Sequence, residues 1–216
     1  MINIQSFTFN PFAENTYILY DETLECIIID PGCYTKEEKK MVSDFILEQK
    51  LKPVKLLNTH CHIDHILGNL FIVKKYGLKL EIHKGEIPVL DSTEFVAKMY
   101  GLPNVELSPE PELFLEEDQV INFGNSSLLV KFTPGHSPAS VSFYAPEDGF
   151  ILGGDVLFQG SIGRTDLPGG NYDTLMKSIF DEFLSLPDET IVYSGHGAPT
   201  SIAHEKRHNP FITSYK

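Results

Sequence analysis

The sequence predicts an α/β fold in which two β-sheets pack face to face and helices cover their outer faces. Short runs of β-branched and aromatic residues alternate with longer amphipathic segments. The order of strands followed by helices occurs twice along the chain, without any repeat at the level of residues. A length of 216 residues fits one domain, so we expect residues 1–216 to form a single unit.

The first half begins with strands. Tyr17–Tyr20 and Cys26–Ile29 are β-rich runs, and the breaker Asp30-Pro31-Gly32 ends the second one. Thr35 and Glu38 form a capping-box pattern, which predicts the start of the first helix. The remaining elements of this half are expected as strands at Val54–Leu57 and Leu80–His83, a helix starting near Asp64, and a weaker helical pattern over Ile87–Tyr100.

The second half repeats this order after a proline-rich segment. Pro103–Pro111 holds three prolines, and we predict that it is the loop that crosses between the two halves. Strands are expected at Leu128–Phe132, Val141–Tyr144, Phe150–Leu152 and Thr190–Tyr193, and a helix over 172–184.

Charge and composition limit the class of partner. The chain has 30 acidic and 17 basic residues, a net charge of −13, which repels phosphate backbones and anionic lipids. We therefore expect neither nucleic acid nor membrane as a partner. The N-terminal residues lack a signal-peptide pattern, and no stretch approaches the ~18 apolar residues that span a bilayer. The three cysteines favour a reducing compartment, so we predict a cytoplasmic protein.

The segment Thr59–His65 carries the strongest chemical signal. Its spacing, H-x-H-x-D-H, puts four potential metal ligands between a strand and a helix. Alternate residues of an extended chain point the same way, so His60 and His62 can converge on one point. Asp64 and His65, in the first helical turn, can then face a second point. Imidazoles with one carboxylate suit Zn²⁺, Fe²⁺ or Mn²⁺, and the spacing argues against a merely polar loop.

Three further ligand candidates follow at a distance along the chain. His136, Asp155 and His196 each come after an apolar strand and beside glycine. Glycine lets the backbone approach closely, and strand ends commonly present functional groups. Together with the first four residues they make a set of seven ligands, enough for two metal ions.

The order H-x-H-x-D-H, His, Asp, His resembles that of the metallo-β-lactamase-fold hydrolases over nearly the whole chain. The resemblance implies a single αββα sandwich domain with two divalent metals at one edge of two mixed sheets. It also implies that zinc is the first choice of metal, with iron or manganese as alternatives, and that Asp64 and Asp155 are catalytic. The implied ligands are His60, His62 and His136 for the first metal, Asp64, His65 and His196 for the second, and Asp155 bridging both.

Two features indicate a branch of this family. True β-lactamases usually lack the bridging aspartate, so Asp155 favours the glyoxalase II and persulfide dioxygenase branch. The stretch Phe158–Asp166 is similar to the G-x-G-[RK]-x-D signature of small glyoxalase II-like proteins. Arg164 matches the basic position that helps to bind glutathione there, which implies a substrate-binding role. An ion pair between Arg164 and Asp166 that braces the loop is the alternative.

The activity implied is hydrolysis of a small thioester, because a metal-bound water with a pKa near 7 supplies hydroxide at neutral pH. One alternative is a persulfide dioxygenase, with a single Fe²⁺ held by His60, His136 and Asp155. A second alternative is a non-catalytic, metal-stabilised binding module, although seven ligands on glycine-rich loops argue for open coordination positions. The acyl group, the thiol carrier and the oligomeric state stay open.

Departures from the family pattern concern glutathione. Full-length glyoxalase II carries a C-terminal extension that binds it, whereas this sequence ends at Lys216. The tyrosines that such enzymes place near the basic residue and the last histidine are here Asp166 and Ala198. We therefore expect weak recognition of glutathione and activity on thioesters of other carriers.

Secondary expectations concern residues near the motif and the remaining histidines. Asp30 is expected to hydrogen-bond a ligand imidazole. Cys61, between two ligands, should turn away from them into the core. His83 is expected to be structural, and His204 and His208 to be solvated in a polar tail.

Overall fold

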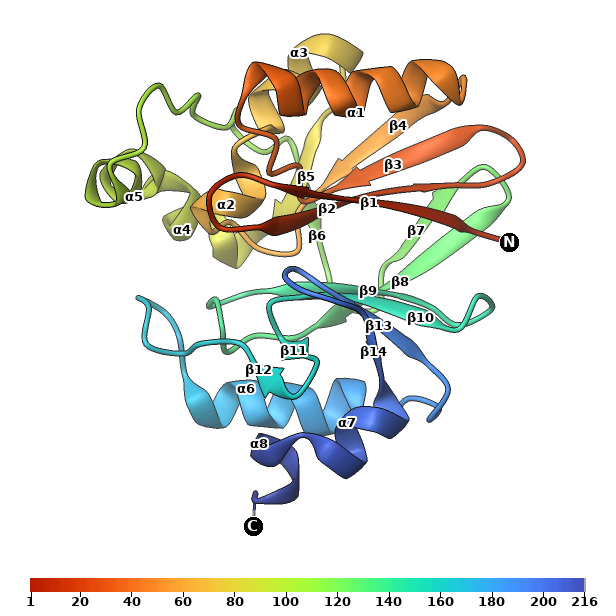
Figure 1. The fold of residues 1–216 in the computed structure, drawn as a ribbon, viewed down its shortest axis with the longest axis vertical. Coiled ribbons are helices and arrows are strands. Elements are labelled where there is room, and N and C mark those ends of the chain that lie inside the picture. Colours follow the sequence, from red (N-terminus) through yellow and green to blue (C-terminus); the bar gives the residue numbers. More distant parts are fainter. Residues whose placement is uncertain (216) are drawn as a thin grey trace.

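The computed structural model describes residues 1–215 and has four layers, in the order helices, sheet, sheet, helices (Figure 1). The helices α1 (Lys36–Glu48) and α3 (Asn69–Tyr76) lie on the outer face of the first sheet. The C-terminal helices cover the outer face of the second sheet at the opposite end of the molecule. The predicted αββα sandwich is therefore confirmed.

The first sheet is mixed and contains the strands of the N-terminal half. Its first three strands are antiparallel neighbours, whereas the later ones pair in parallel and are joined through helices. Its strand order is β1 (Asn3–Phe9), β2 (Glu14–Tyr20), β3 (Glu25–Ile29), β4 (Lys52–Leu57), β5 (Leu80–His83) and β6 (Leu113–Leu115).

The second sheet is also mixed. All of its neighbouring strands are antiparallel except β10 and β13. A separate hairpin, β11 (Leu157–Phe158) and β12 (Ser161–Ile162), follows β10. The strand order of the second sheet is β14 (Thr200–Ser201), β13 (Ile191–Ser194), β10 (Phe150–Gly154), β9 (Val141–Ala145), β8 (Ser126–Phe132) and β7 (Val120–Phe123).

The first helix begins as predicted. The Thr35 side chain accepts from the backbone N–H of Glu38, whose own side chain caps in return, and α1 follows. The helix expected near Asp64 is instead two, α2 (Ile63–Ile66) and α3, separated at Gly68. A Cβ at Gly68 would lie 2.4 Å from the Cys33 sulfur, so the close packing of this turn requires glycine.

The other helices lie beside the sheets and at the C-terminal end. The weak pattern over 87–100 corresponds to α4 (Ile87–Asp91) and α5 (Thr93–Tyr100). The helix expected over 172–184 is α6 (Tyr172–Ser178), which continues as a π-helical turn, Ile179–Phe183. The C-terminal segment was expected as a polar tail but forms α7 (Ile202–His208) and α8 (Pro210–Thr213), because Ile202 and Ile212 are buried against the second sheet.

The proline-rich segment does not cross between the sheets, contrary to our expectation. It connects α5 to β6, and β6 still pairs with β5 in the first sheet. The chain passes to the second sheet between β6 and β7. Both of these strands are short and lie at sheet edges, where the buried pattern of a central strand is absent.

The central core lies between the two sheets. Leu19, Ile29 and Leu57 of the first sheet pack there with Phe143 and Leu152 of the second, all nearly inaccessible to solvent. This packing places the carboxyl ends of β4, β8, β10 and β13 at one edge, where each strand leads into a loop that carries predicted ligands.

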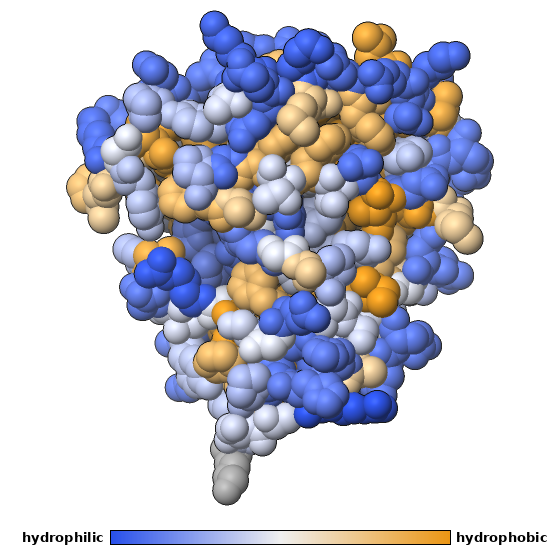
Figure 2. Space-filling view, in the orientation of Figure 1, coloured by the Kyte–Doolittle hydropathy of each residue, from blue (hydrophilic) through white to orange (hydrophobic). Residues whose placement is uncertain are grey.

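Figure 2 shows a mostly hydrophilic face, with apolar side chains gathered in a band over the half that carries the first sheet. Within residues 1–215, no helix combines the length and the apolar character required to cross a membrane.

Candidate metal centre

Four loops bring the seven predicted ligands together. The loop after β4 carries His60 to His65, and the loops after β8, β10 and β13 contribute His136, Asp155 and His196. Six of them form two groups of three, and Asp155 lies between the groups. The structure thus places all seven side chains in one site, at the sheet edge from which the loops emerge.

The first group consists of His60, His62 and His136. Their ligand atoms all lie within 4.8 Å of one another. His62 Nδ1 and His136 Nε2 are only 2.8 Å apart. His60 Nε2 is buried and has no hydrogen-bond partner. An unpartnered buried nitrogen costs free energy, so three converging ring nitrogens fit a cation between them.

The second group consists of Asp64, His65 and His196, again with ligand atoms within 4.8 Å. Asp64 Oδ2 lies 3.1 Å from His196 Nε2 and 3.7 Å from His65 Nε2. The Nε2 atom of His65 is buried without a hydrogen-bond partner, like that of His60. A carboxylate with two imidazoles is a donor set that divalent zinc, iron and manganese all accept.

Asp155 lies between the two groups. Its Oδ1 is 3.5 Å from His65 Nε2, and its Oδ2 is 3.5 Å from both His136 Nε2 and His196 Nε2. Oδ1 is a third buried atom without a partner. A Cβ at Gly195 would lie 2.1 Å from Oδ1, so this close approach requires glycine. The carboxylate is placed to serve both groups at once.

The opposite nitrogens of these histidines are held by the protein. His65 Nδ1 lies 3.1 Å from Asp30 Oδ2, which confirms the expected contact of Asp30 with a ligand imidazole. His136 Nδ1 donates to the backbone carbonyl of Arg164, and His196 Nδ1 lies 3.1 Å from that of Phe12. Rings that the protein holds at one nitrogen, with the other nitrogen facing the remaining donors, are the usual arrangement around a metal.

A third cluster of donors, Asp30, His60 and His65, is a hydrogen-bonded brace rather than another metal position. Asp30 already accepts from the backbone N–H and the hydroxyl of Thr59 and from the amide of Asn58, besides facing His65. Its two oxygens therefore have no free capacity for an ion.

The histidines of the first group are poor bases. Burial, and then the neighbouring histidines, hold the pKa of His60 well below its ordinary value. Burial and His136 lower the pKa of His62 to about 3. Burial also lowers the pKa of His136, although Asp155 opposes this. Neutral imidazoles keep the lone pairs that a metal needs.

The second group has the opposite tendency. Burial disfavours a charged His65, but Asp64 and Asp155 outweigh it and raise its pKa well above the ordinary value. Burial likewise opposes the charged form of His196, and its hydrogen bond to Asp64 raises its pKa. Burial would raise the pKa values of Asp64 and Asp155, but the charge on His65 lowers both.

Arg164 lies outside both groups. Its guanidinium makes two hydrogen bonds to the carboxylate of Asp166, at 2.7 and 2.8 Å, and both side chains are exposed. This is the ion pair that the sequence left open as an alternative. Arg164 contacts the centre through its backbone carbonyl, which accepts a hydrogen bond from His136 Nδ1.

The remaining residues singled out in the sequence lie away from the donor atoms. Cys61 is buried in the core beneath α1 and α3, as expected. The ring of His83 packs against Phe132 and accepts from the backbone N–H of Gly85. His204 and His208 are exposed, but on a helix rather than in a tail.

Sequence reasoning missed two supports of the centre. The turn between β1 and β2 reaches His196 through the carbonyls of Phe12 and Ala13, 184 and 183 positions away. Glu86, at the end of the 3₁₀ turn Lys84–Glu86, contacts two ligand loops. Backbone contacts leave no trace in residue types, and an isolated glutamate has no motif around it.

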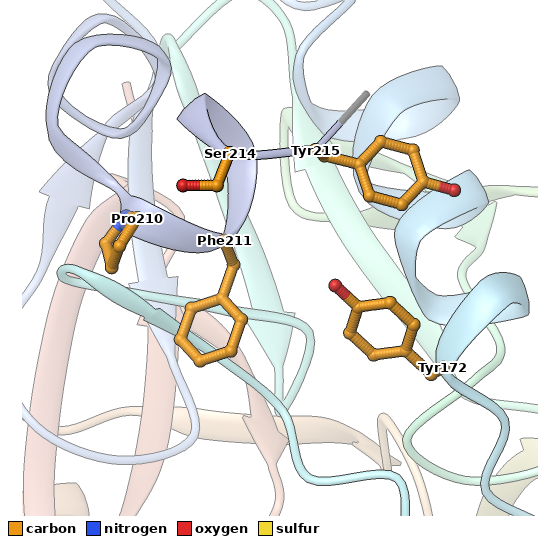
Figure 3. Close-up of a pocket in the computed structure, with 5 residues that line it drawn as sticks. All are labelled: Tyr172, Pro210, Phe211, Ser214 and Tyr215. Atoms are coloured by element: carbon orange, nitrogen blue, oxygen red, sulfur yellow. The ribbon is translucent and has the colours of Figure 1, made fainter.

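The protein also has a small hollow near the C-terminal end, separate from the centre. It has a volume of about 310 Å³ and is lined by Tyr172, Pro210, Phe211, Ser214 and Tyr215. Figure 3 shows the rings of Tyr172, Phe211 and Tyr215 around it. None of its lining residues is a histidine, a cysteine or an acid, so it offers no metal ligands.

The fold agrees with comparisons of sequence. The family profile of the metallo-beta-lactamase superfamily matches residues 9–196, and the chain belongs to this superfamily. A probable metallo-hydrolase of Bacillus subtilis is 38% identical over 209 residues, 95% of each chain. A hydroxyacylglutathione hydrolase of Haemophilus influenzae is 32% identical over 214 residues, 99% of each chain. These relatives support a metal-dependent hydrolase.

Solved structures agree with the same assignment. BLEG-1, described as a B3 metallo-beta-lactamase, superposes with a TM-score of 0.89 at 34% identity and covers 99% of this chain and 100% of its own. The protein TTHA1623, solved in a di-iron-bound form, has a TM-score of 0.85 at 36% identity, with 96% and 99% covered. The fold is thus shared by a protein described as a lactamase and by one that binds two irons.

Proposed function

We propose that this protein is a two-metal hydrolase of small thioesters, with zinc as its metal. The observation that carries the proposal is the pair of donor groups that share Asp155, with unpartnered buried nitrogens on His60 and His65. Both groups are equally complete, which supports two ions rather than the single iron of a dioxygenase. Open positions between loops favour catalysis over a closed structural site.

Each residue of the centre has a defined part in this proposal. His60, His62 and His136 would hold the first ion, Asp64, His65 and His196 would hold the second, and Asp155 would contact both. When bound, the two ions supply a nucleophilic water at neutral pH and polarise the substrate carbonyl. The charge on His65 lowers the pKa of Asp64, so this residue would offer an ionised carboxylate to the second ion.

The chemistry of the leaving group and the similarity to a known hydrolase support a thioester as the substrate. A leaving thiolate comes from a thiol of pKa about 8.5 and needs little protonation, so no acid is required at the leaving group. The Haemophilus influenzae relative is a hydroxyacylglutathione hydrolase and aligns over 99% of this chain. We assign Arg164 to the binding of a substrate carboxylate. This carboxylate would replace that of Asp166 as the partner of the Arg164 guanidinium.

The proposal includes a small-molecule partner in the cytoplasm. The net charge of −13 disfavours nucleic acid and anionic lipid, and three buried free cysteines suit a reducing compartment. We propose that residues 1–216 act as one domain, since the two sheets share the central core.

The test combines metal analysis with a substrate panel. Protein purified without added metal is analysed for metal content per chain. Hydrolysis is then measured with S-lactoylglutathione, a truncated thioester and a chromogenic cephalosporin, and oxygen uptake is measured with glutathione persulfide. We expect two zinc ions per chain and turnover of both thioesters.

The other outcomes point elsewhere. A single iron with oxygen uptake on the persulfide would assign the protein to the dioxygenases. Turnover of the cephalosporin alone would make it a lactamase, the description given to BLEG-1. Bound metal without turnover of any of these substrates would favour the non-catalytic, metal-stabilised binding module.

A further inference from the structure

Glu86 is a buried carboxylate outside the ligand set. It ends the 3₁₀ turn that follows β5, and its side chain is inaccessible to solvent. Burial raises its pKa, although hydrogen bonds from Ser137 and from two backbone N–H groups oppose this. A buried acid is costly unless its oxygens are satisfied, so its partners indicate its role.

The oxygens of Glu86 accept hydrogen bonds from two different ligand loops. Oε2 accepts from the backbone N–H of Cys61 at 2.9 Å, between His60 and His62. Oε1 accepts from the backbone N–H of Ala139 at 2.8 Å, and the Ser137 hydroxyl lies 2.7 Å from both oxygens.

These two loops come from opposite sheets. The loop with His60 and His62 follows β4 of the first sheet, and the loop with His136 follows β8 of the second. Val141 N–H also donates to the Thr59 carbonyl between the same two loops. Glu86 adds a carboxylate that binds both loops at once, beside all three histidines of the first group.

We propose that Glu86 is a positioning residue that holds His60, His62 and His136 in register and so sets the affinity of the first metal position. This inference rests on the metal assignment proposed above. The second group is held differently, by Asp30 on His65 and by the carbonyls of the β1–β2 turn on His196. Loss of Glu86 should therefore weaken one position only.

Glutamine is the sharpest probe of this role. Each carboxylate oxygen of Glu86 accepts from one backbone N–H, and glutamine has the same shape with a single accepting oxygen. Whichever way the amide turns, its NH₂ faces either the Cys61 or the Ala139 N–H. Glu86→Gln thus always breaks one of the two loop contacts. Ser137→Ala removes only the hydroxyl and leaves both backbone contacts in place.

The experiment measures metal affinity in two single-site backgrounds by competition with a chromogenic chelator. His196→Ala retains the first group and His136→Ala retains the second. Adding Glu86→Gln to the first background should raise the Kd about 10–100-fold, and in the second background it should change little. Ser137→Ala should act in the same direction with a smaller effect. The visible spectrum of the Co²⁺-substituted first position should change with Glu86→Gln.

The matched control is Glu205→Gln. Glu205 is equally buried and accepts from a backbone N–H, a hydroxyl and an amide, of Gly160, Thr200 and Asn209, none of which carries or adjoins a ligand. Unchanged affinity and Co²⁺ spectrum in the Glu86→Gln and Ser137→Ala variants would overturn the proposal. So would an equal loss in both backgrounds, or an equal loss with Glu205→Gln. If the unaltered protein bound no metal pair, the proposed function itself would fail.

Discussion

His60, His62 and His136 meet as three imidazoles, whereas Asp64, His65 and His196 combine two imidazoles with a carboxylate. The pKa values of the first three histidines are lowered, chiefly by burial. Those of His65 and His196 are raised, because neighbouring carboxylates outweigh burial. Two groups of similar size, within one site, therefore differ in the protons that they carry without metal.

The protons carried by each group affect how that group binds a metal ion. The first group offers neutral nitrogens and an unpartnered Nε2 on His60, so a cation enters without displacing protons. The second group is internally neutralised by ion pairs between His65, His196 and their carboxylates. A metal must replace these protons, so its binding there is coupled to pH.

The largest expected effect comes from Asp155→Ala, because this carboxylate faces both groups. Losing several kcal/mol of stabilisation at both positions should lower kcat/KM about 10³-fold or more. Both metals should also be released more easily to a chelator. Asp188→Asn, at an exposed carboxylate paired with Lys206, is the control and should change neither quantity. Two tightly bound metals and near-normal turnover in Asp155→Ala would show that Asp155 does not bridge.

The next effect separates the two groups. His196→Ala should empty the second position and leave one metal per chain, because His196 Nε2 faces Asp64 and Asp155. His136→Ala should likewise empty the first position. Metal content is measured after dialysis against a weak chelator. Two metal ions per chain in His196→Ala would show that His196 is a residue of the turn and not a metal ligand.

The pH dependence sharpens the comparison. His65 and His196 have pKa values above the ordinary 6.5, so below their pKa each holds a proton that the metal displaces. The Kd of the position retained in His136→Ala should therefore rise as pH falls from about 8 to about 6, by about tenfold per unit for each proton displaced. The position retained in His196→Ala should change little, because its histidines are already neutral. Equal slopes in calorimetric titrations of the two variants would contradict the assignment.

Much of this architecture follows from local sequence signals. The capping box of Thr35 and Glu38, the strand Leu80–His83 and the αββα order agree with the structure. Local signals also placed the four residues of H-x-H-x-D-H together, because backbone geometry alone brings alternate side chains to one side. These features depend on neighbours only a few residues apart.

Other features depend on tertiary contacts and had no local signal. The strands β6 and β7 were missed because they are short edge strands of three and four residues. The break at Gly68 depends on Cys33, which is distant in sequence. The contacts of Glu86 with two ligand loops are set by the packing of sheet against sheet, so residue types around position 86 could not reveal them.

The smallest effect concerns Arg164, where the sequence left two roles open and the structure shows the ion pair with Asp166. If Arg164 also binds a substrate carboxylate, the two carboxylates compete for one guanidinium. Arg164→Ala should then raise KM about tenfold with little change in kcat, because it removes one charge-assisted hydrogen bond to the substrate. Asp166→Asn should lower KM a few-fold, because an exposed ion pair contributes at most about 1 kcal/mol.

Steady-state kinetics with S-lactoylglutathione and with a truncated thioester distinguish these roles. A rise of KM in both variants would show that the Arg164–Asp166 pair braces the loop, since either loss then has the same effect. An unchanged KM in both variants would show that the Arg164 side chain has neither role. The contribution of Arg164 would then be its backbone carbonyl, which accepts from His136 Nδ1 and is retained whatever the side chain. Opposite shifts in KM are the result that only competition for the guanidinium explains. A shift confined to the glutathione substrate would further locate the bound carboxylate on its carrier, because the truncated thioester lacks that group.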